Sequence, residues 1–396
     1  MEYRRFGKTE LRMPVLTAGC MRFQASWKAE ETDKITDEGQ ANVLACLRRA
    51  LELGINHVET ARGYGTSEYQ VGLALKALPR EEILLQTKVG PTETGEQFLA
   101  DFEDSMTRLG VDGVDLLSIH GINNAEKLDR SVRPGGCLDV LAKLQAAGRV
   151  QHVGFSTHGP AEIVVKAIET GRFEYVNLHW FWIDQTRWPA VRAATDRDMG
   201  VFIISPTDKG GKLQAPSEKL VRLCKPLSPI AFNDLFCLGH EEVHTLSIGA
   251  SVPTDYDEHN GAVERLGEAD TPELVRQIVE RLEGECRAVL GETWCETWGE
   301  GLPGWPDTPH EVNIPLILWL YNLAKALDLV EYAKGRYGLL GNGGDWFPGS
   351  KLGDVDPAEL AGVLAGSPHA EKIPALLAEA HALFGGEDSK RLQAEE

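Results

Sequence analysis

The chain has 396 residues, of which 42% are hydrophobic and 25% are charged, the balance of a globular protein with a substantial core. Its formal net charge of −20 argues against nucleic acid as a partner, because phosphate binding needs clustered Lys and Arg. It contains no apolar run of about 18 residues, and its first residues, MEYRRFGKTELRMP, are charged. We therefore expect no membrane span, no signal peptide and a cytoplasmic location.

The cysteines argue against two further classes of protein. There are seven, an odd number at scattered spacings without a C-x-x-C pair, so neither a disulfide framework nor an ordinary zinc site is expected. They are Cys20, Cys46, Cys137, Cys224, Cys237, Cys286 and Cys295. We predict that the chain holds no metal.

The first 262 residues alternate between strand-like and helix-like patterns. The leading EYRRFGKTELRMP predicts a β-hairpin with a Gly-Lys turn that closes the bottom of the fold. Short apolar runs predict eight strands, at 15–21, 57–60, 82–88, 114–120, 150–156, 175–180, 200–205 and 243–249. Between them lie amphipathic helical patterns such as 41–54 and 137–149, which are followed or closed by glycine. This alternation predicts a (β/α)8 TIM barrel over residues 1–262, and a doubly wound open sheet is the alternative.

The character of the sequence changes after residue 262. Helical patterns occur at 272–290, in PLILWLYNLAKALDLVEYAKGRYG, and in two short segments near 357–365 and 371–384. A region rich in Trp, Pro and Gly separates the first two, and LLGNGGDWFPG at 339–349 is irregular. We predict a small, mostly helical C-terminal domain at 263–384 and a flexible charged tail at 385–396.

Ionisable side chains fall where the predicted strands end. Glu59 ends the second strand, Lys88 the third and His120 the fourth, and Tyr64 lies in the loop after the second. Barrel enzymes build their active sites at this end of the strands. A phenol near an ammonium held by a carboxylate can donate a proton, and an imidazole can orient a carbonyl oxygen. Each residue alone also has an ordinary interpretation, as a solvated, turn or core side chain.

Around these residues the chain resembles the aldo-keto reductase family. GINHVETARGYGTSE is similar to the family's second-strand motif, LLQTKVG to its lysine motif and DLLSIHG to its histidine motif, in the same order. The resemblance implies a (β/α)8 barrel that uses a nicotinamide cofactor to reduce aldehydes and ketones. It implies that Tyr64 is the general acid, that Lys88 lowers the pKa of Tyr64, and that His120 orients the substrate. The family usually has Asp at the place of Glu59.

No G-x-G-x-x-G follows a strand, so a Rossmann site is not indicated and cofactor binding must use the barrel rim. ISPTDKGGKL follows the seventh strand and IGASVPTDYDEH the eighth, where barrels often bind phosphate. The resemblance implies contacts with the nicotinamide amide from Ser156 and Asn177, with the pyrophosphate side from Ser205 and Lys209, and near the adenosine from Ser251 and Glu258. Met21, Gly210, Gly249 and Asp255 complete the expected cofactor-binding set.

Two departures from the family bear on the cofactor, which we expect to be NAD or NADP. Ile204 stands where many relatives stack an aromatic ring on the nicotinamide, and Asp255 stands where many NADP-dependent relatives carry an Arg. A carboxylate repels a 2′-phosphate and accepts a hydrogen bond from a free ribose hydroxyl, which favours NAD.

The segment HWFWIDQTRW follows the sixth strand. Trp180 and Trp182 are candidates to line an apolar pocket for a small-molecule carbonyl substrate, and packing beneath the next helix is the alternative. The sequence leaves the oligomeric state open.

The C-terminal segment HEVNIPLILWLYNLAKALDLVEYAKGRYGLLGNGG resembles the tail of the aldo-keto reductase branch that carries a ferredoxin-like 4Fe–4S domain. Such a cluster needs four thiolates as a rule, and this region offers only Cys286 and Cys295. We therefore expect no iron–sulfur cluster and a domain held by Trp294, Trp298 and Trp305.

Together these features predict an NAD(P)-dependent oxidoreductase that transfers a hydride between nicotinamide and an aldehyde, ketone or alcohol. One alternative is a nicotinamide-nucleotide sensor or regulatory protein with little turnover. Another is an electron-transfer protein with a cluster, which iron analysis would identify.

Overall fold

The computed structural model describes residues 1–353, 355–386 and 388, and it forms two compact units. The first unit contains 1–210 and 230–271, and the second contains 211–229 together with the chain from 272 onward. The expected boundary at 262 thus differs from the observed one, and the assignment of 211–229 to the second unit was not foreseen. The expected flexible tail at 385–396 lies largely outside the described residues.

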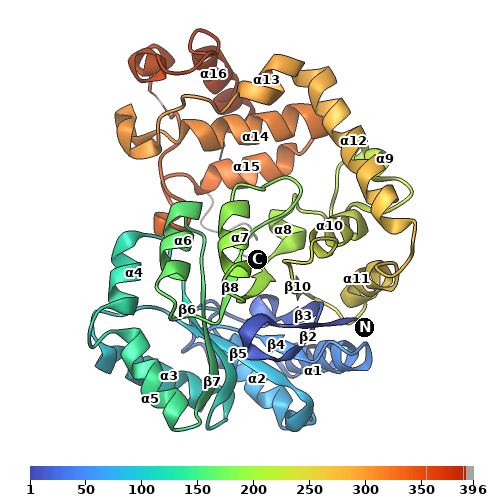
Figure 1. Ribbon diagram of the computed structural model, residues 1–396, viewed down its shortest axis with the longest axis vertical. Helices are drawn as coiled ribbons and strands as arrows, with labels where there is room; N and C mark the ends of the chain where they lie inside the picture. Colours follow the sequence, from blue (N-terminus) through green and yellow to red (C-terminus); the bar gives the residue numbers. More distant parts are fainter. Residues whose placement is uncertain (354, 387, 389–396) are drawn as a thin grey trace. The chain divides into compact units, whose positions relative to one another are not determined.

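The first unit is a closed barrel of parallel strands, in the order β10-β3-β4-β5-β6-β7-β8-β9 (Figure 1). The strands are β3 (Leu16–Gly19), β4 (His57–Glu59), β5 (Leu84–Val89), β6 (Val114–His120), β7 (Val150–Ser156), β8 (Tyr175–Leu178), β9 (Gly200–Ile203) and β10 (Thr245–Gly249). All eight predicted strands are present, which confirms the TIM barrel and rules out the open sheet.

Helices follow the strands around the barrel, and Figure 1 shows α3 and α5 side by side on its outer face. They are α1 (Asp37–Glu52), α2 (Ser67–Leu75), α3 (Gly95–Leu109), α4 (Ala125–Val132), α5 (Cys137–Ala146), α6 (Ala161–Glu169), α7 (Trp188–Thr195), α8 (Pro206–Lys209), α10 (Pro229–Leu238) and α11 (Asp255–Glu264). Local capping sets their ends: the Thr94 side chain accepts a hydrogen bond from the backbone N–H of Gln97 at the start of α3, and Gly110, at φ +66°, ends it.

The predicted hairpin closes the N-terminal end of the barrel. Strands β1 (Tyr3–Arg5) and β2 (Arg12–Pro14) pair antiparallel, and Phe6 between them is fully buried. The Phe6 ring lies 5.6 Å from the ring of Tyr175, the first residue of β8. A Cβ on Gly200, the first residue of β9, would lie 2.5 Å from the Phe6 ring. This end is therefore filled, and the loops at the carboxyl ends of the strands are left for chemistry.

The second unit is helical. Its helices are α9 (Glu218–Cys224), α12 (Thr271–Leu290), α13 (Glu292–Thr297), α14 (Ile314–Leu327), α15 (Val330–Leu339) and α16 (Ile373–Phe384). Short 3-10 turns in the chain are η1 (Gly7–Thr9), η2 (Cys20–Phe23), η3 (Thr32–Lys34), η4 (Arg80–Glu82), η5 (Trp305–Asp307), η6 (Pro309–Glu311), η7 (Gly344–Trp346) and η8 (Pro357–Leu364). The single long helix expected after Pro315 is wrong: Asp328 has φ +55°, which ends α14, and α15 packs against α14.

One of the three tryptophans expected to hold the second unit lies in its core. Trp294 is 4% exposed, donates its indole N–H to Asn322 at 2.8 Å, and has the Lys372 ammonium 4.3 Å from its ring centre. Trp298 and Trp305 are only partly buried, so of the three tryptophans only Trp294 lies in the core.

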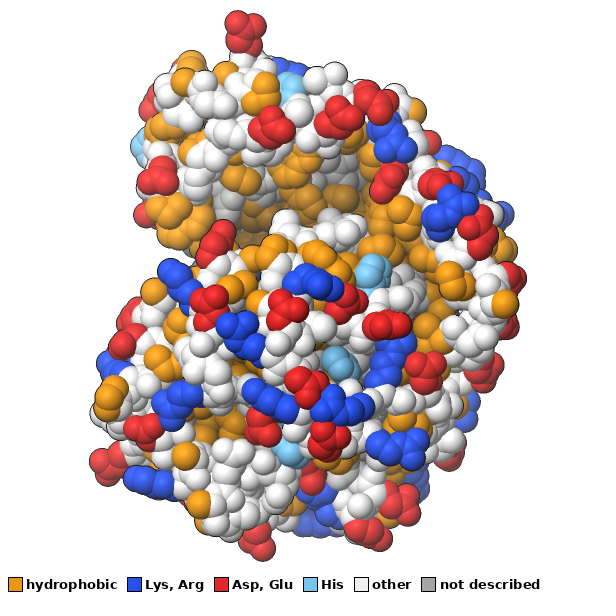
Figure 2. Space-filling view, viewed as in Figure 1, with side chains coloured by type: hydrophobic (Ala, Val, Ile, Leu, Met, Phe, Trp, Pro, Cys, Tyr) orange, Lys and Arg blue, Asp and Glu red, His pale blue; other side chains and the backbone are white. Residues whose placement is uncertain are grey.

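Charged side chains of both signs occur together on one face of the molecule (Figure 2). On the face that Figure 2 shows, basic and acidic side chains are interspersed. Within the described ranges, no helix is long and apolar enough to cross a membrane. In the same residues, no group of three or more His, Cys, Asp or Glu side chains is arranged to hold a metal ion.

Candidate active site

The four predicted chemical residues meet at the carboxyl ends of neighbouring strands. Lys88 in β5 donates to the Tyr64 hydroxyl at 3.0 Å and to the carbonyl oxygen of Thr60 at 3.2 Å. Its ammonium also contacts the carboxylate of Glu59, the last residue of β4. The rings of Tyr64 and His120 lie edge to face, with centres 5.7 Å apart. We call Glu59, Tyr64, Lys88 and His120 the proton-transfer group.

The loop that carries Tyr64 is held by close backbone contacts. Gly65 has φ +55°, and a Cβ there would lie 2.0 Å from the carbonyl oxygen of Ser26, so only glycine fits. The Thr66 hydroxyl accepts hydrogen bonds from the backbone N–H groups of Ala25 and Ser26 at 2.9 and 3.2 Å. These contacts fix the phenol next to Lys88.

Glu59 fits where the family usually has Asp because its neighbours make room. Its second carboxylate oxygen accepts a hydrogen bond from the Ser247 hydroxyl of β10 at 3.0 Å. A Cβ on Gly19 would lie 2.4 Å from the Ser247 oxygen and 3.5 Å from that carboxylate oxygen. The absent side chain of Gly19 thus leaves space for the Ser247 hydroxyl that holds the longer acid, which keeps its contact with Lys88.

Burial controls the ionisation of this group. Burial lowers the pKa of Lys88 well below its ordinary value, and the adjoining Glu59 carboxylate opposes that loss of charge. Burial also raises the pKa of the Tyr64 phenol. This direction is opposite to the expected lowering of the Tyr64 pKa, because desolvation disfavours the charged phenolate. The phenol remains protonated at neutral pH, the state that a proton donor needs.

His120 is a neutral imidazole. Burial, followed by the positive charges of Lys88, Lys127 and Lys209, lowers its pKa to about 3. At neutral pH it therefore carries one ring N–H and can donate a hydrogen bond without adding charge.

Two of the expected nicotinamide-binding residues lie side by side. Ser156 ends β7 and pairs in register with Asn177 of β8. The Ser156 hydroxyl accepts the backbone N–H of Gly121 at 3.1 Å, and the Asn177 amide oxygen accepts the Ser118 hydroxyl at 3.4 Å. The Asn177 side-chain NH₂ is fully buried and has no hydrogen-bond partner among the described residues. A carboxamide oxygen would satisfy this donor, so these residues fit a nicotinamide.

The loops after β9 and β10 are joined by an arginine that the sequence interpretation missed. Arg22, next to Met21 in η2, donates to the Ser251 hydroxyl at 3.2 Å and to the Asp208 carboxylate at 2.8 Å. Gly249 leaves space for it, since a Cβ there would lie 3.3 Å from the Arg22 Nε. In the sequence, the one indication of this role was that Arg22 directly follows Met21, an expected cofactor-binding residue. The guanidinium suits the phosphates of a dinucleotide.

The remaining expected cofactor residues differ in their surroundings. The Asp255 carboxylate accepts the backbone N–H groups of Ser251 and Val252 at 2.7 and 3.1 Å, and Glu258 is exposed on α11. Ser205 has φ +54°, a left-handed conformation that is uncommon for serine, and Gly210 directly follows α8. Lys209 directs its Nζ to the rings of His158 and His179, at 3.3 and 3.0 Å.

Ile204, which stands where many relatives have an aromatic residue, is a buried side chain. Ile204 is 9% exposed and belongs to a core cluster that includes Phe6, Tyr175 and Phe202.

Trp180 lies in the core and does not line a substrate pocket. It is 1% exposed and packs between Trp188 of α7 and Phe236 of α10, with ring centres 4.9 and 5.1 Å away. The expectation of a substrate contact from Trp180 is therefore wrong, and packing beneath the next helix is correct. Trp182 is partly exposed and lies 6.2 Å from the ring of Phe232.

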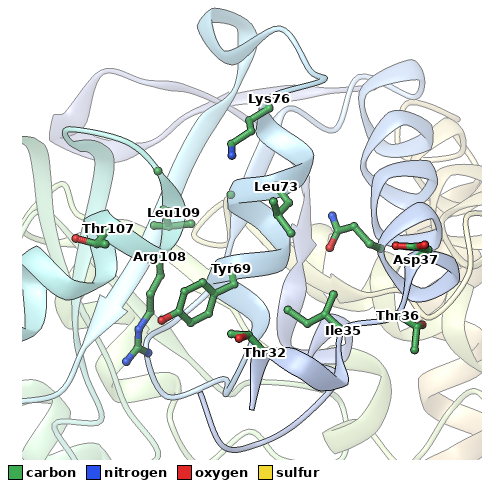
Figure 3. Close-up of a pocket in the computed structure, with 13 residues that line it drawn as sticks. Thr32, Ile35, Thr36, Asp37, Tyr69, Leu73, Lys76, Thr107, Arg108 and Leu109 are labelled. Carbon is green, nitrogen blue, oxygen red and sulfur yellow. The ribbon is translucent and has the colours of Figure 1, made fainter. Parts of the chain in front are cut away.

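A pocket of about 480 Å³ lies on the outside of the barrel, away from this chemistry. Figure 3 shows Tyr69 and Leu73 from α2 beside Ile35, which precedes α1, and Arg108 at the end of α3. None of the proton-transfer group lines it.

The sequence profile of the Aldo/keto reductase family matches residues 15–207, which contain the whole proton-transfer group. The match lies within the barrel unit. The chain is 26% identical over 285 residues to L-galactose dehydrogenase of Arabidopsis thaliana, covering 64% of this chain and 86% of that protein. It is 28% identical over 176 residues to L-glyceraldehyde 3-phosphate reductase of Escherichia coli, covering 40% of this chain and 46% of that protein. The family match and the dehydrogenase and reductase names of these relatives indicate an NAD(P)-dependent oxidoreductase.

Solved structures share the fold. An aldo-keto reductase from Bacillus halodurans in its holo form aligns with a TM-score of 0.58 at 20% identity, over 70% of this chain and 96% of that one. One from Klebsiella pneumoniae in complex with NADPH aligns with a TM-score of 0.56 at 16% identity, over 70% and 95%. At these identities the likeness concerns the fold alone.

Proposed function

We propose that the barrel unit reduces an aldehyde or ketone reversibly, with Tyr64 as the general acid and base. The observation that carries this is the 3.0 Å contact between the Lys88 ammonium and the Tyr64 hydroxyl, beside the Glu59 carboxylate and His120. A protein that only bound a nucleotide would have no use for a buried ammonium against a phenol. That contact favours an enzyme over a sensor.

Each member of the group has a distinct role in reduction. Tyr64 donates its hydroxyl proton to the carbonyl oxygen while a hydride adds to the carbonyl carbon, so that an alcohol forms. Lys88 donates to the phenolate oxygen that remains, and Glu59 keeps Lys88 in place and charged. The N–H of neutral His120 donates to the carbonyl oxygen and orients it. A bound NADH or NADPH supplies the hydride.

The cofactor would be held at two places on the rim. Ser156 and the buried NH₂ of Asn177 would hold the carboxamide, and Arg22 and Ser251 would contact phosphate. The Asp255 carboxylate, placed at the start of α11, favours NAD because it repels a 2′-phosphate. The seven cysteines are free thiols, which suits a reducing compartment, so we place the activity in the cytoplasm.

Binding and turnover test this function separately. NADH and NADPH are titrated in turn against tryptophan fluorescence, and we expect saturable binding with NADH the tighter ligand. Reduction of 4-nitrobenzaldehyde is then followed for wild type, for Tyr64→Phe and for the control Tyr69→Phe on α2. We expect Tyr64→Phe to lower the rate at least 100-fold and Tyr69→Phe to leave it unchanged.

Tight nucleotide binding with equal, very slow turnover in all three proteins would favour the sensor. Absence of binding by either nucleotide would refute the placement of the cofactor.

A further inference from the structure

A buried polar network connects three strands beneath the proton-transfer group. Gln86 of β5 donates its side-chain NH₂ to the Ser118 oxygen of β6 at 3.0 Å, and the Ser118 hydroxyl donates to the amide oxygen of Asn177 on β8 at 3.4 Å. All three side chains are fully buried. Gln86 stands two residues before Lys88 on β5. Ser118 stands two residues before His120 on β6, so both side chains lie on the inward face, one layer below the proton-transfer group.

A glycine in the intervening strand lets this network cross the barrel interior. Strand β7 lies between β6 and β8, and its Gly154 pairs in register with Ser118 on one side and Tyr175 on the other. A Cβ on Gly154 would lie 2.5 Å from the Tyr175 ring, so the ring occupies the space that a side chain there would fill. The Tyr175 hydroxyl lies 3.1 Å from the Ser118 oxygen. Ser118 thus reaches β8 because β7 carries no side chain at this level.

The donor and acceptor atoms give the network a direction. A side-chain NH₂ only donates, so Gln86 uses a lone pair of the Ser118 oxygen, and the Ser118 hydrogen points away from Gln86. On that side both acceptors belong to β8: the Tyr175 oxygen and the amide oxygen of Asn177. Because the amide oxygen is held toward Ser118, the NH₂ of the same group is turned away from Ser118.

The network therefore ends on a buried donor that needs an acceptor. Of its three side chains, the NH₂ of Asn177 is the one donor without a hydrogen-bond partner in the described part of the chain. Burying such a donor costs free energy, which an acceptor on a ligand recovers. The two ends of an Asn amide have nearly the same shape, so an unrestrained amide could turn its oxygen to the ligand instead. The contact with Ser118 opposes that rotation.

We propose that Gln86 and Ser118 are positioning residues that hold the Asn177 amide with its NH₂ toward the carboxamide oxygen of a bound nicotinamide. The proposal rests on the reductase function, because it deepens the role of Asn177 in the cofactor site. The carboxamide is attached to one edge of the nicotinamide ring, so an oriented carboxamide restricts which face of the ring meets the substrate. Gln86 and Ser118 act through Asn177 and are not catalytic residues.

Nucleotide analogues test this orientation in the wild-type protein. Thio-NADH has sulfur, a weak acceptor, in place of the carboxamide oxygen, whereas reduced 3-acetylpyridine adenine dinucleotide keeps the oxygen and has methyl in place of the NH₂. Affinities are measured by isothermal titration calorimetry. We expect thio-NADH to bind about 10-fold more weakly than NADH and the acetyl analogue to lose less affinity than thio-NADH does. Equal losses, or a larger loss for the acetyl analogue, would overturn the proposal.

Variants test whether Ser118 produces the orientation. Ser118→Ala removes the hydroxyl, and Ser105→Ala, at a fully buried serine of α3, is the matched control. We expect Ser118→Ala to weaken NADH binding about 10-fold, while ADP-ribose, which lacks the nicotinamide, binds within about twofold of wild type. Ser105→Ala should leave both affinities unchanged, and Ser118→Thr, which restores the hydroxyl, should recover most of the affinity for NADH. Equal losses for NADH and ADP-ribose in Ser118→Ala would refute the positioning role.

Double variants show whether both residues act through Asn177. Gln86→Met alone should weaken NADH binding about threefold. In an Asn177→Leu background, neither Ser118→Ala nor Gln86→Met should weaken it further, and the difference between NADH and thio-NADH should disappear. Losses that add in full would refute the network. Melting temperatures check the fold of each variant, and the comparison of analogues on wild type decides the orientation if a variant does not fold.

These measurements separate the network from the reductase function, since all of them are equilibrium binding. The expected affinities in a protein that reduces no carbonyl would support the network and refute the reductase. Reduction of 4-nitrobenzaldehyde by a Ser118→Ala protein with unchanged NADH affinity would refute the network and leave the reductase standing.

Discussion

Replacement of Lys88 by methionine is the sharpest test of the proton-transfer group. The Lys88 Nζ lies 3.0 Å from the Tyr64 oxygen. At that distance a full phenolate charge is stabilised by about 5.5 kcal/mol for an effective dielectric constant of about 20. If half the charge has developed in the transition state, the loss is about 2.8 kcal/mol, or about 100-fold in rate. Lys88 is fully buried, so an unbranched apolar side chain of similar length suits the space.

The rate to measure is hydride transfer in a single turnover, because release of product can mask the chemical step in kcat. Stopped-flow absorbance of enzyme-bound NADH, mixed with excess 4-nitrobenzaldehyde, reports it directly. Circular dichroism of Lys88→Met checks that the fold persists. We expect hydride transfer to slow about 100-fold while NADH affinity stays within about twofold.

A double-mutant cycle with Tyr64→Phe shows whether Lys88 acts through the phenol. If it does, Lys88→Met has no further effect once the hydroxyl is gone, and the double variant matches Tyr64→Phe. A loss of less than fivefold in the single variant would refute the argument, as would full additivity in the cycle. Either would mean that the 3.0 Å contact does not stabilise developing phenolate.

Three other variants test neighbouring claims. Glu59→Gln leaves a buried ammonium without its counter-charge, so urea unfolding should show a loss of about 3–5 kcal/mol; an unchanged midpoint would contradict the ion pair. Asp255→Asn keeps the hydrogen bonds to the α11 loop but removes a charge, so fluorescence titration should show NADPH affinity improving about fivefold relative to NADH. His120 has a folded pKa of about 3, below its ordinary 6.5, so the folded protein binds fewer protons and loses stability as pH falls from 6.5 toward 3. His120→Asn should lose less stability than wild type over that range in urea titrations, and parallel losses would contradict the low pKa.

The proton-transfer group could be predicted because its geometry follows from topology. Glu59, Lys88 and His120 each lie at or near the end of a strand, and parallel strands in a barrel all end at the same rim. Their convergence therefore needed only the strand pattern, which the apolar runs marked clearly. The phenol lay in a loop, but a five-residue connection from Glu59 limits how far it can move.

Other features depended on contacts that no local pattern contains. The break at Asp328 occurs within a continuous helical pattern, and an aspartate in the left-handed region has no signal beyond its residue type. In the sequence, Trp180 and Trp182 are equally good candidates to line a substrate pocket. Only the packing of α10 against Trp180 shows that Trp180 lies in the core. Lys209 lies in a loop that suggested phosphate, yet its long side chain reaches two histidines from other loops.

Glu59 stands where the family usually has Asp, and residues far from it in the sequence accommodate its longer side chain. The extra methylene moves the carboxylate outward from β4, and two residues in other strands accommodate it: Gly19 by lacking a side chain, and Ser247 by donating to the second oxygen. Because Glu59 and Ser247 are 188 positions apart, the sequence alone could not connect them. Glu59→Asp alone should therefore create a small void and weaken the bond to Ser247, rather than improve the pair with Lys88. The longer acid, the glycine and the serine act as one unit that holds Lys88 against the phenol.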